Sequence, residues 1–292
     1  MKNDWPSNRV TDPVRYLNAP VGQPGSGRVR YGAAMELWRA GRISAEVLEV
    51  FRVTSAHDAR DPFAVLKERG LPFPEVATME SPINCLYAEA RDYLLALDHP
   101  GAAEVRAGLP MDPGEERKVP SQANAVVATW LAPALEIVAR DRPALAAAID
   151  RAAGLLTWLT YDAYPLEQIG ERFARNHAFA SIMGDDAPFA AEDFDLGLFL
   201  IAPGVLYRDH AHLAPELYAP LTGPHGWRFG PGRPLIVKPP HEPVWNPPMQ
   251  PHLTRVGSVP FLCFFLWTKD VNEVAMVLPA DDWSALEEVL IG

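Results

Sequence analysis

The sequence predicts an α+β protein, in which a helical region precedes a domain of antiparallel strands. Apolar residues between 32 and 160 recur at the three- and four-residue spacing of buried helical faces. From about residue 194, short apolar runs alternate with turns rich in Gly and Pro, as strands do. We therefore divide the chain into an irregular arm over 1–31, a helical region over 32–180 and a strand-rich domain over 181–292.

Composition and charge narrow the function classes. The 292 residues are 48% hydrophobic and carry a formal net charge of −11, which argues against a sequence-independent nucleic-acid binder. There is no apolar run of 18 residues and no apolar N-terminal core of a signal peptide, so we expect no membrane partner. The two cysteines, Cys85 and Cys263, each lie in an apolar run, so a disulfide framework is not expected. These features predict a soluble, cytoplasmic protein; a homodimer is compatible with them.

Helix starts in the first half are marked by capping residues. Ser44 precedes a helix to about Val53, and Asp61 followed by proline starts another that Gly70 ends. Ser81 followed by proline repeats this start, and an apolar stripe follows it. The stripe comprises Ile83, Leu86, Tyr87, Ala90, Leu94 and Leu97. Such stripes indicate a core and not a site, and no catalytic group of residues is visible between 32 and 160.

The remaining helices and the strands follow in order. We expect a helix over 33–40, a charged linker over 102–120, helices over 121–140 and from 142 onward, and a helix-like segment over 167–175. The expected strands are 196–201, the strand through His210, 216–221, 234–237, 261–267 and 273–278, with a closing helix over 282–290. The run 261–267 suits a strand buried on both faces. Residues 223–232 are predicted to be a turn-rich stretch, and eight prolines between 231 and 251 favour loop or edge positions there.

One stretch carries residues of metal-ligand type. His210 and His212 share a face of a strand, and Pro215 is expected to end that strand. Glu216 and Tyr218 then return on the next strand, again on one shared face. Imidazole nitrogens with a carboxylate oxygen suit one divalent transition metal, with Zn, Fe, Mn, Co and Ni all open.

The spacing of this stretch resembles a known signature. From Gly204 to Gly223 the pattern Gly-x5-His-x-His-x3-Glu-x6-Gly is similar to the first signature of the cupin superfamily. This resemblance implies a small antiparallel β-barrel with a metal ion in its mouth. It also implies one further histidine from a later strand, and Pro247 and His252 hold the positions of a second, degenerate signature. There, His241 and Met249 stand where the signature has glycines, and Val256 stands for an asparagine.

A narrower resemblance covers about residues 155–280. Tyr207-x2-His210-x-His212-x3-Glu216-x-Tyr218, with His252 and a strand ending in Trp267, looks like the cupin-type dimethylsulfoniopropionate (DMSP) lyases. The resemblance implies a divalent metal held by His212, Glu216, His252 and either His210 or Tyr218. It also implies a tyrosine base and the release of dimethyl sulfide with acrylate from a small carboxylate substrate.

The residues suit this chemistry. A metal-bound carboxylate stabilises charge at the neighbouring carbon, and a cation beside a phenol favours the phenolate that a tyrosine base requires. A sulfonium group fits aromatic faces, and Trp267 and Trp227 are our candidates for binding it. Both Tyr207 and Tyr218 are candidate bases. Tyr207 lies an odd number of residues from His212, so it reaches the site only if a bulge intervenes at residues 208–209.

Two alternatives stay open. The chain could be a cupin metalloenzyme of another reaction type, such as an oxygenase, an isomerase or a hydrolase. It could also be a non-catalytic protein that binds a small molecule in its barrel, although a full ligand set argues against a simple sensor.

Overall fold

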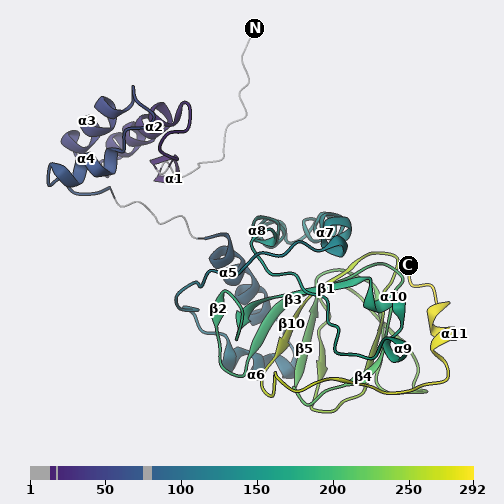
Figure 1. Ribbon diagram of the computed structural model, residues 1–292. Helices are drawn as coiled ribbons and strands as arrows, with labels where there is room; N and C mark the ends of the chain where they lie inside the picture. The colour runs from purple at the N-terminus through teal and green to yellow at the C-terminus, as the bar shows by residue number, and fades with distance from the viewer. Residues whose placement is uncertain (1–13, 18, 75–80) are drawn as a thin grey trace, which may run out of the picture. The chain divides into compact units, whose positions relative to one another are not determined.

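The computed structural model describes residues 14–17, 19–74 and 81–292 (Figure 1). The chain forms two compact units, Met1–Glu80 and Ser81–Gly292. The helices that we placed in one region over 32–180 are therefore shared between these units. The first part of the expected arm, residues 1–13, lies outside the described residues, whereas its second part contains helix.

The first unit is a small helical assembly. Its helices are α1 (Val14–Leu17), α2 (Ser26–Arg39), α3 (Ala45–Thr54) and α4 (Pro62–Glu68). The predicted caps are present, because Ser44 Oγ accepts from the Val47 amide at 3.2 Å and Asp61 Oδ1 accepts from the Phe63 amide at 2.8 Å. A compact apolar core holds the unit together: Leu17, Ala33, Ala34, Leu37, Val47, Val50, Phe51, Val65 and Leu66.

The second unit begins with helices that cover a sheet. They are α5 (Pro82–Leu95), α6 (Pro100–Gly108), α7 (Ala125–Val138) and α8 (Pro143–Ala153), followed later by the short α9 (Leu166–Ile169), α10 (Glu171–Ala174) and α11 (Trp283–Glu287). The apolar stripe predicted after Ser81 is buried on α5. The expected linker over 102–120 is wrong in its first part, because α6 occupies 100–108. Val105 and Leu109 are buried there. Their burial stabilises a helix in a segment whose mixed composition suggested a linker.

Two sheets follow the helices. The six-stranded sheet has the order β2 (Phe189–Ala190), β1 (His177–Gly184), β3 (Asp195–Ile201), β10 (Phe261–Trp267), β5 (Glu216–Pro220), β8 (Val244–Asn246). The five-stranded sheet has the order β11 (Met276–Val277), β4 (Leu206–Ala211), β9 (His252–Arg255), β6 (His225–Arg228), β7 (Ile236–Lys238). Every pairing is antiparallel except that of β1 with β2.

The sheets differ from the expected barrel in one respect. Among the described residues, no strand pairing joins the two sheets, so they are not closed into a barrel. The proline-rich stretch does supply edges, as predicted, since β7 and β8 are each the last strand of a sheet.

Besides the two-residue β2, two strands lie where none was predicted. β1 starts at His177, inside the expected helical region, because its apolar residues are buried on both faces and show no alternation. β6 lies in the expected turn-rich stretch around Trp227, where four buried residues pair with β7 and β9. Both strands are specified by tertiary burial and not by a local pattern.

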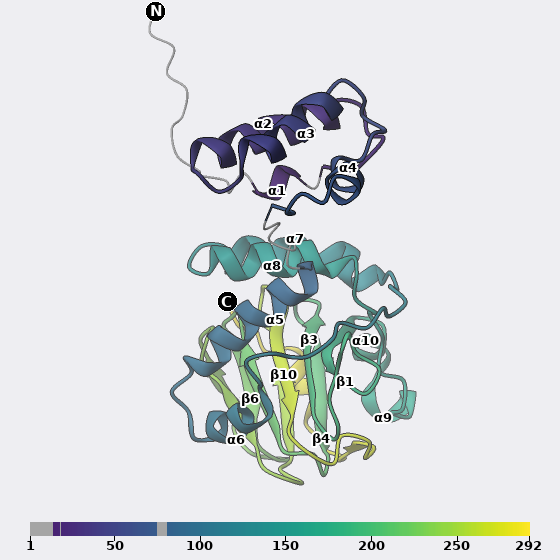
Figure 2. The same cartoon turned by 90° about the vertical axis from the view of Figure 1, so that its left-hand side faces the viewer.

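The six-stranded sheet separates two cores. One face, which we call the helix face, carries Leu198, Phe264 and other aliphatic or aromatic side chains under α5, α7 and α8 (Figure 2). The opposite face, which we call the cavity face, carries Phe199, Cys263 and Phe265 in a second core. Residues 261–267 therefore form a strand buried on both faces, as predicted.

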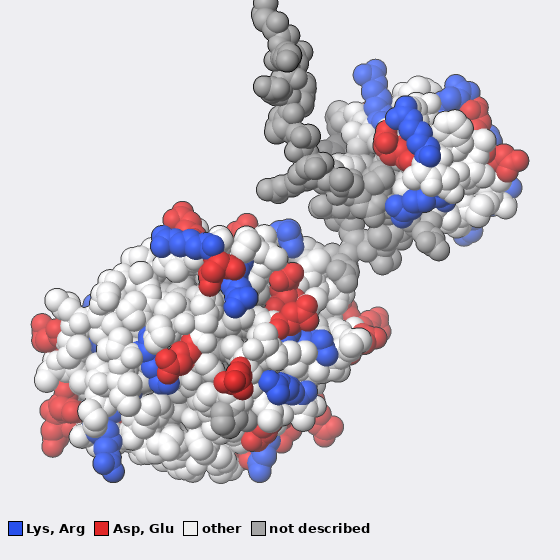
Figure 3. Space-filling view, turned by 180° about the vertical axis from the view of Figure 1, so that it is seen from behind, with Lys and Arg blue, Asp and Glu red and all other residues white. Residues whose placement is uncertain are grey.

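The described surface agrees with the acidic composition. On the side drawn in Figure 3, Lys and Arg side chains are interspersed with Asp and Glu, and no continuous basic surface stands out among the described residues in view. No helix in the described parts of the chain has the length and apolarity needed to cross a membrane.

Candidate active site

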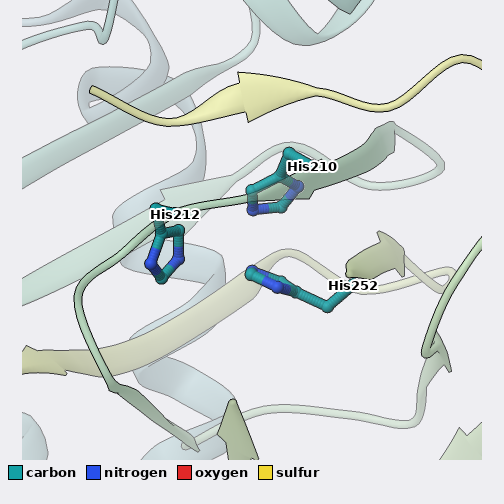
Figure 4. Close-up of side chains that lie close together, drawn as sticks. All are labelled: His210, His212 and His252. Atoms are coloured by element: carbon teal, nitrogen blue, oxygen red, sulfur yellow. The ribbon is translucent and has the colours of Figure 1, made fainter. Parts of the chain in front are cut away.

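Three buried histidines meet at the cavity face. His210 on β4 pairs directly with His252 on β9, so both side chains leave the five-stranded sheet on the same side. His212 follows the end of β4, in the segment that leads the chain to Glu216 and into the other sheet. One ring nitrogen from each histidine lies within 4.8 Å of the others, and the rings turn toward one another (Figure 4).

The hydrogen bonds made by Nδ1 determine the tautomer of each of these rings. Nδ1 of His210 lies 2.8 Å from the Arg208 carbonyl, that of His212 lies 2.8 Å from the Ala214 carbonyl, and that of His252 lies 2.9 Å from the Gln250 carbonyl. A carbonyl only accepts hydrogen bonds, so the proton of each neutral ring belongs on Nδ1. Nε2 of each ring is then left as a lone-pair donor that faces the shared centre.

Glu216 lies beside this group, next to two of its three histidines. Its Oε2 lies 3.2 Å from Nε2 of both His212 and His252, while Trp267 Nε1 donates to its Oε1 at 2.8 Å. Burial acts to raise the pKa of Glu216, but His212 and His252 outweigh it and hold the pKa well below its usual value. Burial acts to lower the pKa of His212, but the carboxylate outweighs it and the pKa is raised. For His210, burial lowers the pKa well below its usual value.

This donor set fits a divalent metal. Nε2 of His210 and Nε2 of His252 are fully buried, and neither has a hydrogen-bond partner of good geometry within the described part of the chain. A buried acceptor without a donor is costly, and lone pairs converging on a carboxylate need a cation between them. Three imidazole nitrogens and one carboxylate oxygen, each imidazole held by a second partner, form the ligand set that first-row divalent ions prefer.

A cavity of about 230 Å³ opens beside Glu216. It is smaller than the ~300–1,000 Å³ of pockets for drug-sized ligands, so it suits a smaller molecule. Its lining is mostly aromatic: Tyr161, Tyr164, Phe173, Phe179, Asp195, Phe199, Tyr207, Glu216, Tyr218, Phe265, Trp267, Val271 and Ala275.

Tyr207 reaches the cavity through a bulge. The register of β4 against β9 shifts between Tyr207 and His210, which meets the condition under which Tyr207 can reach the site. The Tyr207 ring stacks on the His210 ring, with centroids 3.9 Å apart, and its hydroxyl is hydrogen-bonded to that of Tyr164 at 2.8 Å. Burial raises the pKa of Tyr207 well above its usual value, and Tyr164 adds to this.

The other aromatic candidates divide into two groups. Tyr218 lines the cavity two residues beyond Glu216, and burial raises its pKa well above the usual value. Trp267 also lines it, with its ring 4.6 Å from that of His212. Trp227, by contrast, does not line the cavity. It is fully buried behind Tyr218, 5.5 Å away between ring centroids, and packs against Phe261.

Two residues that replace glycines of the second signature have a backbone conformation that favours glycine. His241 and Met249, which stand where the signature has glycine, have φ of 65° and 60°, in the left-handed region that favours glycine. The Met249 amide donates to the carbonyl of His212 at 2.8 Å. This strained residue therefore fixes the loop at one of the clustered histidines.

Sequence reasoning missed three polar residues of the site. Asn246 on edge strand β8 donates to Glu216 Oε2 at 3.2 Å, Tyr164 is bonded to Tyr207, and Asp195 lines the cavity. Each comes from a segment far from the His-x-His stretch, and no local pattern pointed to it. Strand pairing places Asn246 and Asp195 in the site, and Tyr164 comes from the loop before α9.

Comparisons with known proteins agree with this geometry. The dimethylsulfoniopropionate lyase family model matches residues 103–263, more than half of the chain. The chain is 30% identical over 146 residues to the candidate dimethylsulfoniopropionate lyase DddL of Cereibacter sphaeroides, an alignment that covers 48% of this chain and 59% of that protein. It is 30% identical over 128 residues to the dimethylsulfoniopropionate lyase DddQ of Ruegeria pomeroyi, covering 44% and 61%. The chain thus spans less than two thirds of either relative.

Solved structures share the fold. The crystal structure of DddQ from Ruegeria pomeroyi superposes with a TM-score of 0.50 at 24% identity, over 67% of this chain and 95% of that one. A structure described with the DMSP lyases RdDddP and RnDddQII superposes with a TM-score of 0.52 at 21% identity, over 68% and 98%. The resemblance drawn from the His-x-His stretch is confirmed: this chain belongs to the dimethylsulfoniopropionate lyase family.

Proposed function

We propose that this protein is a divalent-metal-dependent carbon–sulfur lyase that cleaves DMSP, or a related small β-sulfonium carboxylate, to dimethyl sulfide and acrylate. The observation that carries this proposal is a group of three histidine nitrogens next to Glu216, which lines a small aromatic cavity. Family membership supports the substrate class.

The proposed ligands are His210, His212, His252 and Glu216. A metal bound there would act as a Lewis acid toward the substrate carboxylate, a contribution worth several kcal/mol to the loss of the neighbouring proton. Asn246 and Trp267 position Glu216 by donating one hydrogen bond to each of its oxygens. These two donors keep the carboxylate in place from the side of the six-stranded sheet.

The base is a tyrosine of the cavity, and both Tyr207 and Tyr218 keep this role in our proposal. The base takes the proton from the carbon next to the carboxylate, and the electron pair forms the carbon–carbon double bond. The bond to sulfur then breaks, and dimethyl sulfide leaves with that bonding pair. The hydroxyl of Tyr164, 2.8 Å from that of Tyr207, gives Tyr207 a partner through which a proton can pass.

The aromatic walls bind the sulfonium end. Each cation–π contact contributes roughly 0.5–2 kcal/mol when the cation is desolvated. Tyr161, Phe265 and Trp267 line the cavity and are placed to make such contacts. The same walls exclude water from the developing negative charge.

The test is the release of dimethyl sulfide into the headspace, with acrylate measured in solution, after DMSP is added to metal-loaded protein. We expect one acrylate for each dimethyl sulfide from the wild type, and loss of both in His212→Ala. His57→Ala is the matched control, because His57 is exposed in the first unit. Equal release from the wild type and from His212→Ala would contradict the proposal.

A further inference from the structure

An acidic residue stands opposite the proposed metal site, on the same face of the same sheet. Trp267 on β10 pairs directly with Asp195 on β3 and with Glu216 on β5. Directly paired residues of antiparallel strands project to the same face, so all three side chains point to the cavity, and all three line it. Neighbouring strands lie ~4.8 Å apart, which puts the Cα atoms of Asp195 and Glu216 about 10 Å apart.

The surroundings of Asp195 leave half of its carboxylate unpaired. Oδ2 accepts a hydrogen bond from Ser181 Oγ at 3.1 Å, and Oδ1 is buried with no hydrogen-bond partner among the described residues. Ser181 comes to this position at a bulge in β1, where the register against β3 shifts between residues 181 and 183. Burial raises the pKa of Asp195 to about 7.

A purely structural role does not account for this arrangement. A carboxylate that served only to bond Ser181 would place its second oxygen in water or against a donor, since a buried unpaired oxygen is destabilising. Oδ1 lies beside Gly184 of β1 and finds no donor there, and the Asp195 side chain lines a cavity with aromatic walls that include Trp267 and Phe265. A carboxylate beside aromatic faces is a binding site for a bulky cation that has no hydrogen-bond donors.

We propose that Asp195 is the counter-ion that selects ligands carrying an onium group, so that the cavity takes zwitterions with a carboxylate at the histidine cluster and a sulfonium or quaternary ammonium at Asp195. The reaction that follows binding rests on the proposed function. The preference for a charged ligand does not depend on it. The residue does not take part in bond breaking. It holds one end of the ligand while the other end lies at His210, His212, His252 and Glu216.

The experiment compares two unreactive probes of the same shape. In 3-(trimethylammonio)propanoate the quaternary centre is a charged nitrogen, and in 4,4-dimethylpentanoate it is a neutral carbon. Affinities are measured by calorimetry on the metal-loaded full chain. We expect the wild type to bind the charged probe at least roughly tenfold more tightly, because the Asp195 carboxylate attracts the cation in a partly desolvated site.

Two variants separate charge from structure. Asp195→Asn keeps the shape of the side chain and removes its charge. We therefore expect its preference for the charged probe to fall by roughly tenfold, to the part that the aromatic walls supply, while its affinity for the neutral probe is retained. Ser181→Ala removes the hydrogen bond and leaves the carboxylate, so the preference is expected to persist. A preference in Asp195→Asn as large as that of the wild type, or no preference in the wild type, would overturn the proposal.

The result of the binding experiment with the two probes does not depend on catalysis. If the protein releases no dimethyl sulfide but shows the charge preference, the proposed reaction fails and the onium site stands. If dimethyl sulfide is released with no charge preference between the probes, the reaction stands and the role of Asp195 fails.

Discussion

The two faces of the six-stranded sheet are built from the same strands but from opposite chemistry. On β3, Leu196, Leu198 and Leu200 are fully buried on the helix face, whereas Asp195 and Phe199 line the cavity. On β10, Phe264 and Leu266 belong to the helix face, and Phe265 and Trp267 to the cavity face. Because strand side chains alternate with period two, neighbouring residues serve separate purposes.

This difference teaches where stability and function lie. The helix face is apolar and close-packed. Truncating a side chain there is therefore expected to lower the free energy of unfolding without changing the activity of the folded protein. The cavity face holds buried tyrosines, Asp195 and Glu216, which are costly to bury and are retained where a ligand or an ion can pair with them. Substitutions on each face test this division.

The largest effect is expected from the cavity-face tyrosines. Replacing the base by phenylalanine removes proton transfer, which is worth about 10²–10⁴-fold in kcat, and leaves thermal stability nearly unchanged. Comparing Tyr207→Phe with Tyr218→Phe by headspace dimethyl sulfide identifies the base, since only one of them is expected to fall this far. Tyr31→Phe in the first unit is the control. Full activity in both cavity variants would contradict a tyrosine base.

Replacing Asp195 is expected to raise the stability of the protein at high pH, whereas most core substitutions lower it. The pKa of Asp195 is raised from 3.8 to about 7, so the folded protein binds more protons than the unfolded chain between these pH values, and stability from this group is lost as the pH rises toward 7. Asp195→Asn should therefore match the wild type near pH 4 and exceed it at pH 8 by about 4 kcal/mol.

Urea unfolding at both pH values measures this difference. The exposed Asp186→Asn is the matched control, and it is expected to change the free energy of unfolding by less than ~0.5 kcal/mol at either pH. A destabilised Asp195→Asn at pH 8 would show that the carboxylate belongs to the packing and not to a site.

A substitution on the helix face is expected to lower stability and to leave activity unchanged. Leu198→Ala removes a fully buried side chain under the helices and should cost about 3 kcal/mol of unfolding free energy, while dimethyl sulfide release per folded molecule stays the same. Leu290→Ala, at a side chain that is 93% exposed, is the control. Loss of activity in folded Leu198→Ala would break the division between the faces.

The smallest effect concerns the loop beside His212. Met249 is strained at φ 60°, so Met249→Gly is expected to raise the unfolding free energy by about 1 kcal/mol, a Tm increase of roughly 2–4 °C. Met249→Ala keeps the strain and should show no gain. Equal melting temperatures for the Gly and Ala variants would refute the strain.

The sequence was informative where signals are local. Short-range chemistry predicts the caps at Ser44, Asp61 and Ser81 and the doubly buried strand 261–267. The cupin resemblance likewise came from one stretch of 20 residues, and the narrower family resemblance added His252 and the strand that ends in Trp267.

What the sequence did not indicate depends on burial or on distant pairing. β1 and β6 have no periodic pattern, and the cavity role of Asp195 depends on its register with Trp267, 72 positions later. Trp227 was expected to bind substrate, yet it lies in the core behind Tyr218. An aromatic residue in a strand-rich segment gives no sign of which layer it occupies.

The central claim is that His210, His212, His252 and Glu216 hold one divalent ion. The most direct test is to strip the protein with a chelator, titrate it with Co²⁺ and follow binding by calorimetry and visible absorption. We predict one ion per chain with the absorption of a nitrogen-and-oxygen site, and at least ~10²-fold weaker binding in His252→Ala. Equal Co²⁺ affinity in the wild type and His252→Ala would contradict the account.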